Sequence, residues 1–177
     1  MKLEFRTLEA DEIEVRVAQA KKNGVSLLLY KDARVDQNIL DEKVGCLNWQ
    51  RHHSRDNANC IVSIWDEEKK QWIEKEDTGT ESNTEKEKGL ASDSFKRACF
   101  NWGIGRELYS SPFIWVDSNN CTIKPTGRTD RYGKDIYGCN DKFIVEQILY
   151  DKKRNIEALA IRNKTANKRV FVWDNRK

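Results

Sequence analysis

The chain contains few residues that interrupt regular structure, with two prolines and nine glycines among 177 residues. This length fits one domain, or one domain with an appended subdomain. No apolar run approaches the roughly 20 residues that a membrane-spanning helix needs. The first residues, MKLEFR, carry no apolar signal segment. We therefore expect a cytoplasmic protein.

The five cysteines, at positions 46, 60, 99, 121 and 139, are scattered and form no Cys-x-x-Cys pair. An odd, dispersed set fits free thiols in a reducing compartment better than a disulfide-framed fold or a zinc site. His52 and His53 are adjacent, so in a strand they point to opposite faces and cannot share a metal ion. We expect no metal and no cofactor.

The formal net charge of +3 conceals an uneven distribution. Residues 118–177 hold 14 Lys and Arg against 7 Asp and Glu, whereas residues 1–117 hold 18 against 22. A basic C-terminal third favours a polyanionic partner such as a nucleic acid, although a solvated basic face has the same composition. Both interpretations stay open on charge alone.

The spacing of apolar residues predicts an α+β fold. We expect strands at residues 12–19, 25–30, 47–53, 60–65 and 71–78, helices at 35–44 and 84–102, an extended piece at 110–116, and strands at 143–150, 156–162 and 169–173. Residues 60–65 are apolar on both faces and should form a central, doubly covered strand. Residues 118–141 are rich in Gly, Asn, Asp and Thr, which indicates a long loop.

The segment KGLASDSFKRACFNWGIGR, residues 88–106, is the most informative part of the chain. At 100° per residue one stripe of the helix is apolar, and Lys96 and Arg97 lie on the opposite side. The stripe consists of Ala91, Phe95, Ala98, Cys99 and Trp102. Thr84 and Glu87 match a capping box, and Gly103 and Gly105 supply a left-handed stop. A bounded helix with two outward cations suggests a surface that receives an anion.

Several segments, taken in order, resemble the annealing domain of the Rad-fifty-two family of recombination proteins, including its phage members of the Sak type. They are RVAQAKKNG (16–24), LYKDARV (29–35), VGCLNW (44–49) and ASDSFKRA (91–98) followed by Trp102 and Gly103. The similarity covers roughly residues 12–116. It implies a single-strand annealing domain at residues 1–117, with residues 118–177 forming a basic loop and a three-stranded extension.

The resemblance implies a β-β-β-α core, an antiparallel meander packed on a helix, with an additional C-terminal antiparallel meander. It also implies a homo-oligomeric ring or helical filament without catalytic residues, acting in homologous recombination and double-strand break repair of a phage or prophage in a bacterial host cell. Single-stranded DNA would lie in a groove with its backbone inward and its bases outward. Possible partners are a host single-strand-binding protein or a phage exonuclease.

Carried over residue by residue, the resemblance assigns the cationic floor of this groove to Arg16, Lys96 and Arg97, with Tyr30 as the adjacent aromatic side chain. The family's eukaryotic members carry a further arginine where this chain has Phe100. The cluster from Arg51 to Arg55 is a candidate DNA-facing strand edge from its charge alone, and we include Arg51 and Arg55 among the candidate DNA-binding residues.

Each candidate also has a structural interpretation. Arg16 could pair with Glu14, Tyr30 could belong to the core, and Lys96 and Arg97 could be ordinary solvated cations. Arg51 and Arg55 could simply occupy a polar strand end.

Two other functions remain. A single-strand coating module would bind DNA without annealing it. A metal-dependent nuclease could use Asp66 with the Glu-x-Lys pattern of Glu68 and Lys70, although two carboxylates in a hairpin turn rarely form a rigid metal site.

Overall fold

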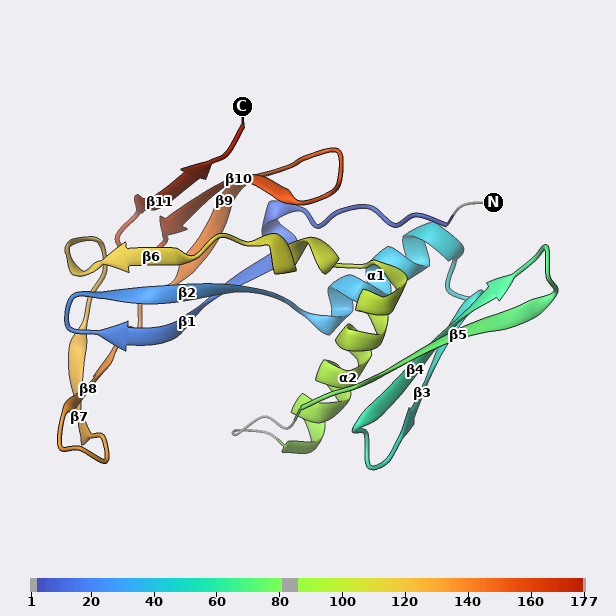
Figure 1. Ribbon diagram of the computed structural model, residues 1–177, viewed down its shortest axis with the longest axis horizontal. Coiled ribbons are helices and arrows are strands. Elements are labelled where there is room, and N and C mark those ends of the chain that lie inside the picture. The colour runs from blue at the N-terminus through green and yellow to red at the C-terminus, as the bar shows by residue number, and fades with distance from the viewer. Residues whose placement is uncertain (1–2, 81–85, 177) are drawn as a thin grey trace. The chain divides into compact units, whose positions relative to one another are not determined.

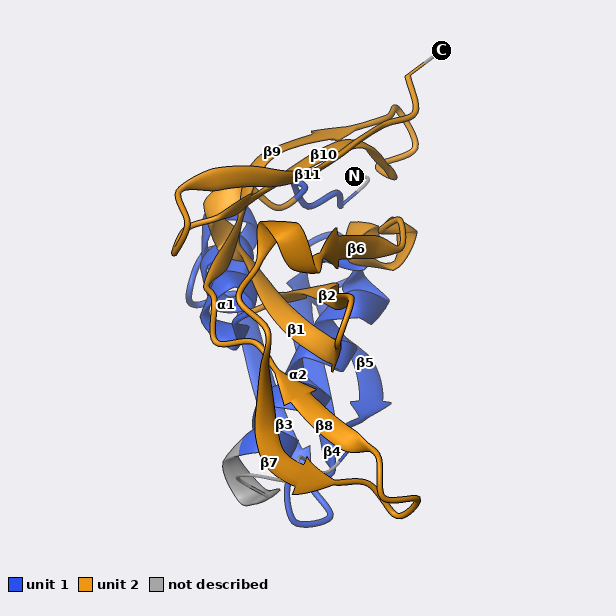
Figure 2. Cartoon of the chain, turned by 90° about the vertical axis from the view of Figure 1, so that its left-hand side faces the viewer, with its two compact units in different colours: residues 1–7, 32–106 blue, residues 8–31, 107–177 orange. Residues whose placement is uncertain are grey.

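The fold is described from a computed structural model, which places residues 3–80 and 86–176, with the backbone alone for residues 86–88 (Figure 1). It is an α+β fold with its strands in antiparallel sheets, as the sequence predicts. The chain divides into two compact units that each draw on separate stretches (Figure 2). The helical unit comprises Met1–Thr7 and Asp32–Arg106, and the sheet unit comprises Leu8–Lys31 and Glu107–Lys177. The predicted boundary after residue 117 does not coincide with this division, because the first hairpin groups with the C-terminal strands.

The helical unit contains a three-stranded meander and two helices. Its strands are β3 (Trp49–Ser54), β4 (Asn59–Asp66) and β5 (Gln71–Thr78), in the order β3-β4-β5, and its helices are α1 (Ala33–Val44) and α2 (Lys86–Trp102). The central position predicted for residues 60–65 is confirmed. Cys60, Val62 and Ile64 are buried on one face of β4, while Ile61 and Trp65 on the other face stay half-buried.

Helix α2 packs on β4 and β5 through the predicted apolar stripe. Phe95, Ala98 and Cys99 are fully buried, and Trp102 donates its indole N–H to the carbonyl of Val62 at 3.0 Å. The helix ends at Trp102, and Gly103 and Gly105 adopt φ of +93° and +72°, the left-handed stop that the sequence predicts. The proposed capping box of Thr84 and Glu87 lies outside the residues whose side chains are described.

Close approach of α2 to the end of β5 depends on Gly79. A Cβ there would lie 2.7 Å from the backbone nitrogen of Ser94, too near for any other residue without a shift. The Gly79 N–H donates to the Ala58 carbonyl at 2.7 Å, which fixes the chain at this point. The meander and α2 are therefore in direct backbone contact.

The sheet unit is built on six strands in the order β11-β10-β9-β1-β2-β6. They are β1 (Ile13–Lys21), β2 (Gly24–Lys31), β6 (Ile114–Asp117), β9 (Phe143–Tyr150), β10 (Ile156–Asn163) and β11 (Lys168–Asp174). The edge strands β6 and β11 contact each other, so the sheet curls and encloses one face. Val25, Val116 and Ile161 are among the completely buried residues of that inner face.

The connection at residues 118–141 differs from the predicted long loop, and this prediction is wrong. A short turn at Ser118–Asn120 is followed by a hairpin of β7 (Lys124–Thr129) and β8 (Asp135–Gly138) that pair only with each other. Every residue from 124 to 136 is exposed, so neither strand carries the apolar alternation that identifies a strand in a sequence.

Other predicted elements are present, and their ends coincide with the predicted ends or differ from them by one or two residues. The piece expected at 110–116 divides into a 3₁₀ turn, Arg106–Ser110, and the short strand β6. The three C-terminal strands form an antiparallel meander, as predicted.

Candidate nucleic-acid interface

Arg16 and Tyr30 lie on the outer face of the β1–β2 hairpin in the sheet unit. Glu14 pairs with Tyr30 and Arg16 with Leu28 in the ladder, which places all four side chains on the same face. The Arg16 guanidinium lies 5.0 Å from the centroid of the Tyr30 ring, a cation–π arrangement. The Arg16 side chain is 61% exposed, and its ring partner is exposed as well. This hairpin therefore presents a cation beside an aromatic face to solvent.

Arg16 also makes an ion pair with Glu14, the structural alternative considered for it from the sequence. The distance from Nη2 of Arg16 to Oε2 of Glu14 is 2.6 Å. Exposed pairs of this kind contribute only about 0–1 kcal/mol, because water competes for both charges. An incoming phosphate could therefore displace Glu14 at little cost. Tyr30 was predicted either to contact DNA or to belong to the core, and its side chain is 37% exposed.

Phe113 and Trp115 extend this outer face, and the sequence analysis did not identify them. Trp115 pairs with Ser26, which lies on the same face of β2 as Tyr30, and its ring covers Gly24, where a Cβ would approach to 2.5 Å. Phe113 stacks on Trp115 with ring centroids 6.5 Å apart and is 77% exposed. The available signal was the alternation of Phe113 and Trp115 with buried Ile114 and Val116. We call Arg16, Leu28, Tyr30, Phe113 and Trp115 the outer face.

Lys96 and Arg97 lie on α2 in the helical unit and face different neighbours. Arg97 points to β5, where its Nε lies 3.4 Å from a carboxylate oxygen of Asp77. Lys96 is close enough to Asp32, at the start of α1, to contribute to the low pKa of that carboxyl, which is set mainly by hydrogen bonds from Arg34. Both cations are half-buried by their surroundings. They are adjacent in sequence but occupy two sides of the helix.

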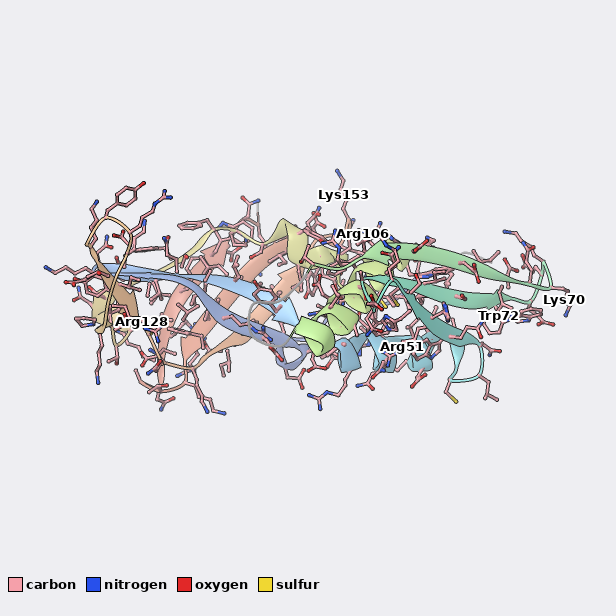
Figure 3. All side chains as sticks on the ribbon, turned by 90° about the horizontal axis from the view of Figure 1, so that it is seen from below. Arg51, Lys70, Trp72, Arg106, Arg128 and Lys153 are labelled. Atoms are coloured by element: carbon pink, nitrogen blue, oxygen red, sulfur yellow. The ribbon has the colours of Figure 1, made fainter. Side chains whose placement is uncertain are left out.

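Arg51 and Arg55 lie on β3 and on the turn after it, also in the helical unit. The Arg51 guanidinium lies 4.9 Å from the ring centroid of Phe95, so this side chain covers the core residue of α2 while remaining exposed (Figure 3). Arg55 begins a run of three left-handed residues, with φ of 51°. The same turn is held by the N–H of Ala58, which donates to the Arg55 carbonyl. Arg51 is thus fixed by a packing contact, and Arg55 is a turn residue with an exposed side chain.

The six predicted residues therefore form two groups. Arg16 and Tyr30 belong to the sheet unit, whereas Arg51, Arg55, Lys96 and Arg97 belong to the helical unit.

The surroundings of His53 lower the pKa of its imidazole. Burial lowers its pKa, and the positive charge of Arg51 lowers it further. Its ring nitrogen lies 3.4 Å from the hydroxyl of Ser94 on α2, which also donates to the carbonyl of Asn57 at 2.9 Å. His53 thus packs between β3 and α2, and its surroundings disfavour the protonated imidazole.

The carboxylates of the nuclease alternative are engaged in the β4–β5 turn. Asp66 accepts the backbone N–H groups of Glu68 and Lys69, each at 3.0 Å. The neighbouring Glu67 accepts from the Trp65 indole and pairs with Lys70. Within residues 3–80 and 86–176, no three His, Cys, Asp or Glu side chains are grouped so that they could hold a metal ion.

Comparison of the chain with protein-family models, with curated proteins and with solved structures gave no match. In the part of the chain that the structure describes, no helix is both long and apolar enough to span a membrane.

Proposed function

We propose that this protein binds single-stranded DNA and anneals complementary strands without ATP, as a Rad-fifty-two-type protein of a phage or prophage that acts in recombination in the bacterial cytoplasm. It would work as a homo-oligomer and without a catalytic residue or cofactor. The observation that carries the proposal is the exposed Arg16–Tyr30 pair on the outer face, with Trp115 and Phe113 beside it.

The chemistry of this face suits a strand that must remain able to pair. Arginine binds phosphate through paired N–H groups and supplies affinity that does not depend on sequence. Base stacking on an aromatic side chain adds roughly 1–3 kcal/mol per base. Cations of the helical unit, Lys96 and Arg97, would hold further phosphates. Repetition in an oligomer would join a few cations per subunit into a continuous track.

The test is a fluorescence assay of annealing of complementary oligonucleotides without nucleotide or metal. The Lys96→Ala/Arg97→Ala variant should lose most of the acceleration, and the salt slope of its single-strand binding should fall by about 1.4, since each phosphate contact contributes roughly 0.7. The matched control is Lys69→Ala/Lys70→Ala, which removes two cations that pair with Asp66 and Glu67 in the same unit.

Arg16 is tested from both sides of its ion pair. Arg16→Ala should weaken single-strand binding, whereas Glu14→Gln should strengthen it, because the competing carboxylate is removed. Unchanged annealing in the Lys96/Arg97 variant, together with unchanged binding in both of these, would refute the proposed site. A wild-type protein that binds tightly but slows pairing would be a coating module instead.

A further inference from the structure

We propose that the β7–β8 hairpin is a DNA-binding arm that contacts the backbone of double-stranded DNA, as a site separate from the outer face and from the cations of α2. The proposal does not depend on annealing activity. It rests on five features of this hairpin, namely its isolation, its anchored base, its cations, the aromatic ring at its tip and its dimensions.

The hairpin stands free of the rest of the sheet unit over most of its length. β7 and β8 form a two-stranded sheet of their own, with Lys124 opposite Gly138 and Thr129 opposite Asp135. Figure 1 shows it at the end of the unit where the β1–β2 turn also lies. A lone two-stranded hairpin is marginally stable in water and gains little from burial. Residues 124–136 are thirteen consecutive exposed residues, so they add no buried side chain to the core of this unit.

The base of the hairpin is nevertheless firmly held. Asp141, just after β8, accepts from the backbone N–H of Thr122 at 2.8 Å and from the side-chain amide of Asn163 at 2.7 Å. Asn163 is completely buried at the end of β10 and also donates to the carbonyl of Asn120. Strand β8 contacts β1 as well. A fixed base with a free ribbon is the arrangement of an arm that reaches out to a ligand.

Three cations of the arm form no ion pair within the part of the chain that the structure describes, in contrast to other arginines of the same unit. Among residues 3–80 and 86–176, no acidic side chain forms an ion pair with Lys124, Arg128 or Lys134. By comparison, Arg162 and Arg169 both pair with Glu146. The arm contains two acidic residues, Asp130 and Asp135. The carboxylate of Asp130 accepts backbone hydrogen bonds in the turn.

The tip of the arm combines a cation with an aromatic ring. Arg131 lies 4.7 Å from the ring centroid of Tyr132, which is 70% exposed. The carboxylate of Asp130 accepts from the backbone N–H groups of Tyr132 and Lys134, at 2.8 and 3.0 Å, and so shapes the turn. Gly133 completes it with a φ of +75°. Asp130 thus orders the tip through these backbone hydrogen bonds.

The dimensions of the arm favour a duplex groove. A strand of six residues extends about 20 Å, and a two-stranded ribbon fits the roughly 12 Å width of the major groove of B-DNA. Lys124 and Arg128 lie on β7, and Arg131 and Lys134 lie in the turn before β8, so the cations are spread along the arm and could reach phosphates on both walls of the groove. A single strand would offer only one line of phosphates.

The experiment compares two double variants of the full-length protein, each of which removes two exposed cations from the sheet unit. Arg128→Ser/Lys134→Ser alters the arm, and Lys152→Ser/Lys153→Ser alters the β9–β10 turn. Figure 3 shows Arg128 and Lys153 at opposite ends of this unit. Binding of a labelled duplex and of a single strand of equal length is measured by anisotropy between about 50 and 200 mM salt.

We expect the arm variant to bind the duplex roughly 10-fold more weakly, with a salt slope lower by about 1.8, since each duplex phosphate contact contributes about 0.9. Single-strand binding and the annealing rate should match those of the control. Three results would overturn the proposal: no duplex binding by the wild type, equal losses in both variants, or a loss confined to the single strand. Thermal unfolding of both variants verifies that the core is intact.

Discussion

At the scale of single residues, packing contacts determine which charged groups remain available. Arg51 lies against Phe95 and cannot leave without uncovering a core ring. Arg16 lies against Tyr30 on the surface and can turn to a phosphate. Lys75, whose ammonium lies 4.6 Å from the Trp102 ring and donates to the Asn101 carbonyl, is committed to the contact between β5 and α2. The neighbour of an arginine or lysine therefore determines whether its charge is committed to packing or stays on the surface.

The residue scale also predicts a pH dependence that arises from His53. Its folded pKa lies below the ordinary value of 6.5, because burial and Arg51 disfavour the cation. The unfolded chain therefore binds more protons, and stability decreases as the pH falls from about 6.5 towards the folded pKa. His53→Gln should reduce the loss of urea midpoint between about pH 7 and pH 5.

The exposed neighbour supplies the control for this prediction. His52→Gln removes one histidine from the adjacent position of β3, whose charge lowers the pKa of His53 less than burial and Arg51 do, and should change the pH dependence less than His53→Gln does. An equal effect of both substitutions would contradict the role assigned to His53.

At the scale of elements, α2 is held by apolar burial on one side and by backbone proximity at Gly79. The burial could be predicted, because the stripe of Phe95 and Ala98 has helical spacing. The close approach of α2 to Gly79 could not be predicted, because no sequence pattern around Gly79 indicates that another element lies against it. The β7–β8 hairpin was predicted as a loop for a related reason, since an exposed hairpin carries no hydrophobic pattern.

The element scale predicts a cost for Gly79→Ala. The new Cβ would meet the backbone of Ser94 at 2.7 Å and that of Leu90 at 3.0 Å, so α2 must shift from β5. Overpacking of this kind costs about 1–3 kcal/mol of unfolding free energy. Urea denaturation of the purified protein measures this cost. Gly138→Ala is the control, because its Cβ would meet only a methyl group of Thr126 at 3.3 Å and should cost less.

At the scale of the whole molecule, each unit is assembled from stretches far apart in sequence. The β1–β2 hairpin pairs with β6 and with β9, so the strands that flank it are supplied from beyond the meander and α2. The resemblance over residues 12–116 does not reveal the pairing of β1 with β9, because it compares residues in the order of the chain and ends before β9.

This arrangement predicts that residues 1–117 are not a complete folding unit. The fragment lacks Phe143, Val145 and Ile161, whose buried side chains help to form the core of the sheet unit. Hydrogen exchange should show β1 and β2 unprotected in the fragment, while β4 and α2 keep the protection that they have in the full chain. Protection of β1 in the fragment equal to that in the full chain would contradict the division into units.

The sequence by itself determined the fold class and the elements outside the β7–β8 hairpin, because apolar spacing encodes which face of a strand or helix is buried. It indicated the stripe and the stop of α2, the central position of β4 and the C-terminal meander. Only the tertiary structure decided the distant partners of these residues: Tyr30 at Arg16, Asp77 at Arg97, and Trp115 over Gly24. Such contacts join residues that are adjacent in space through ladder register and chain reversal, and no local pattern in the chain records them.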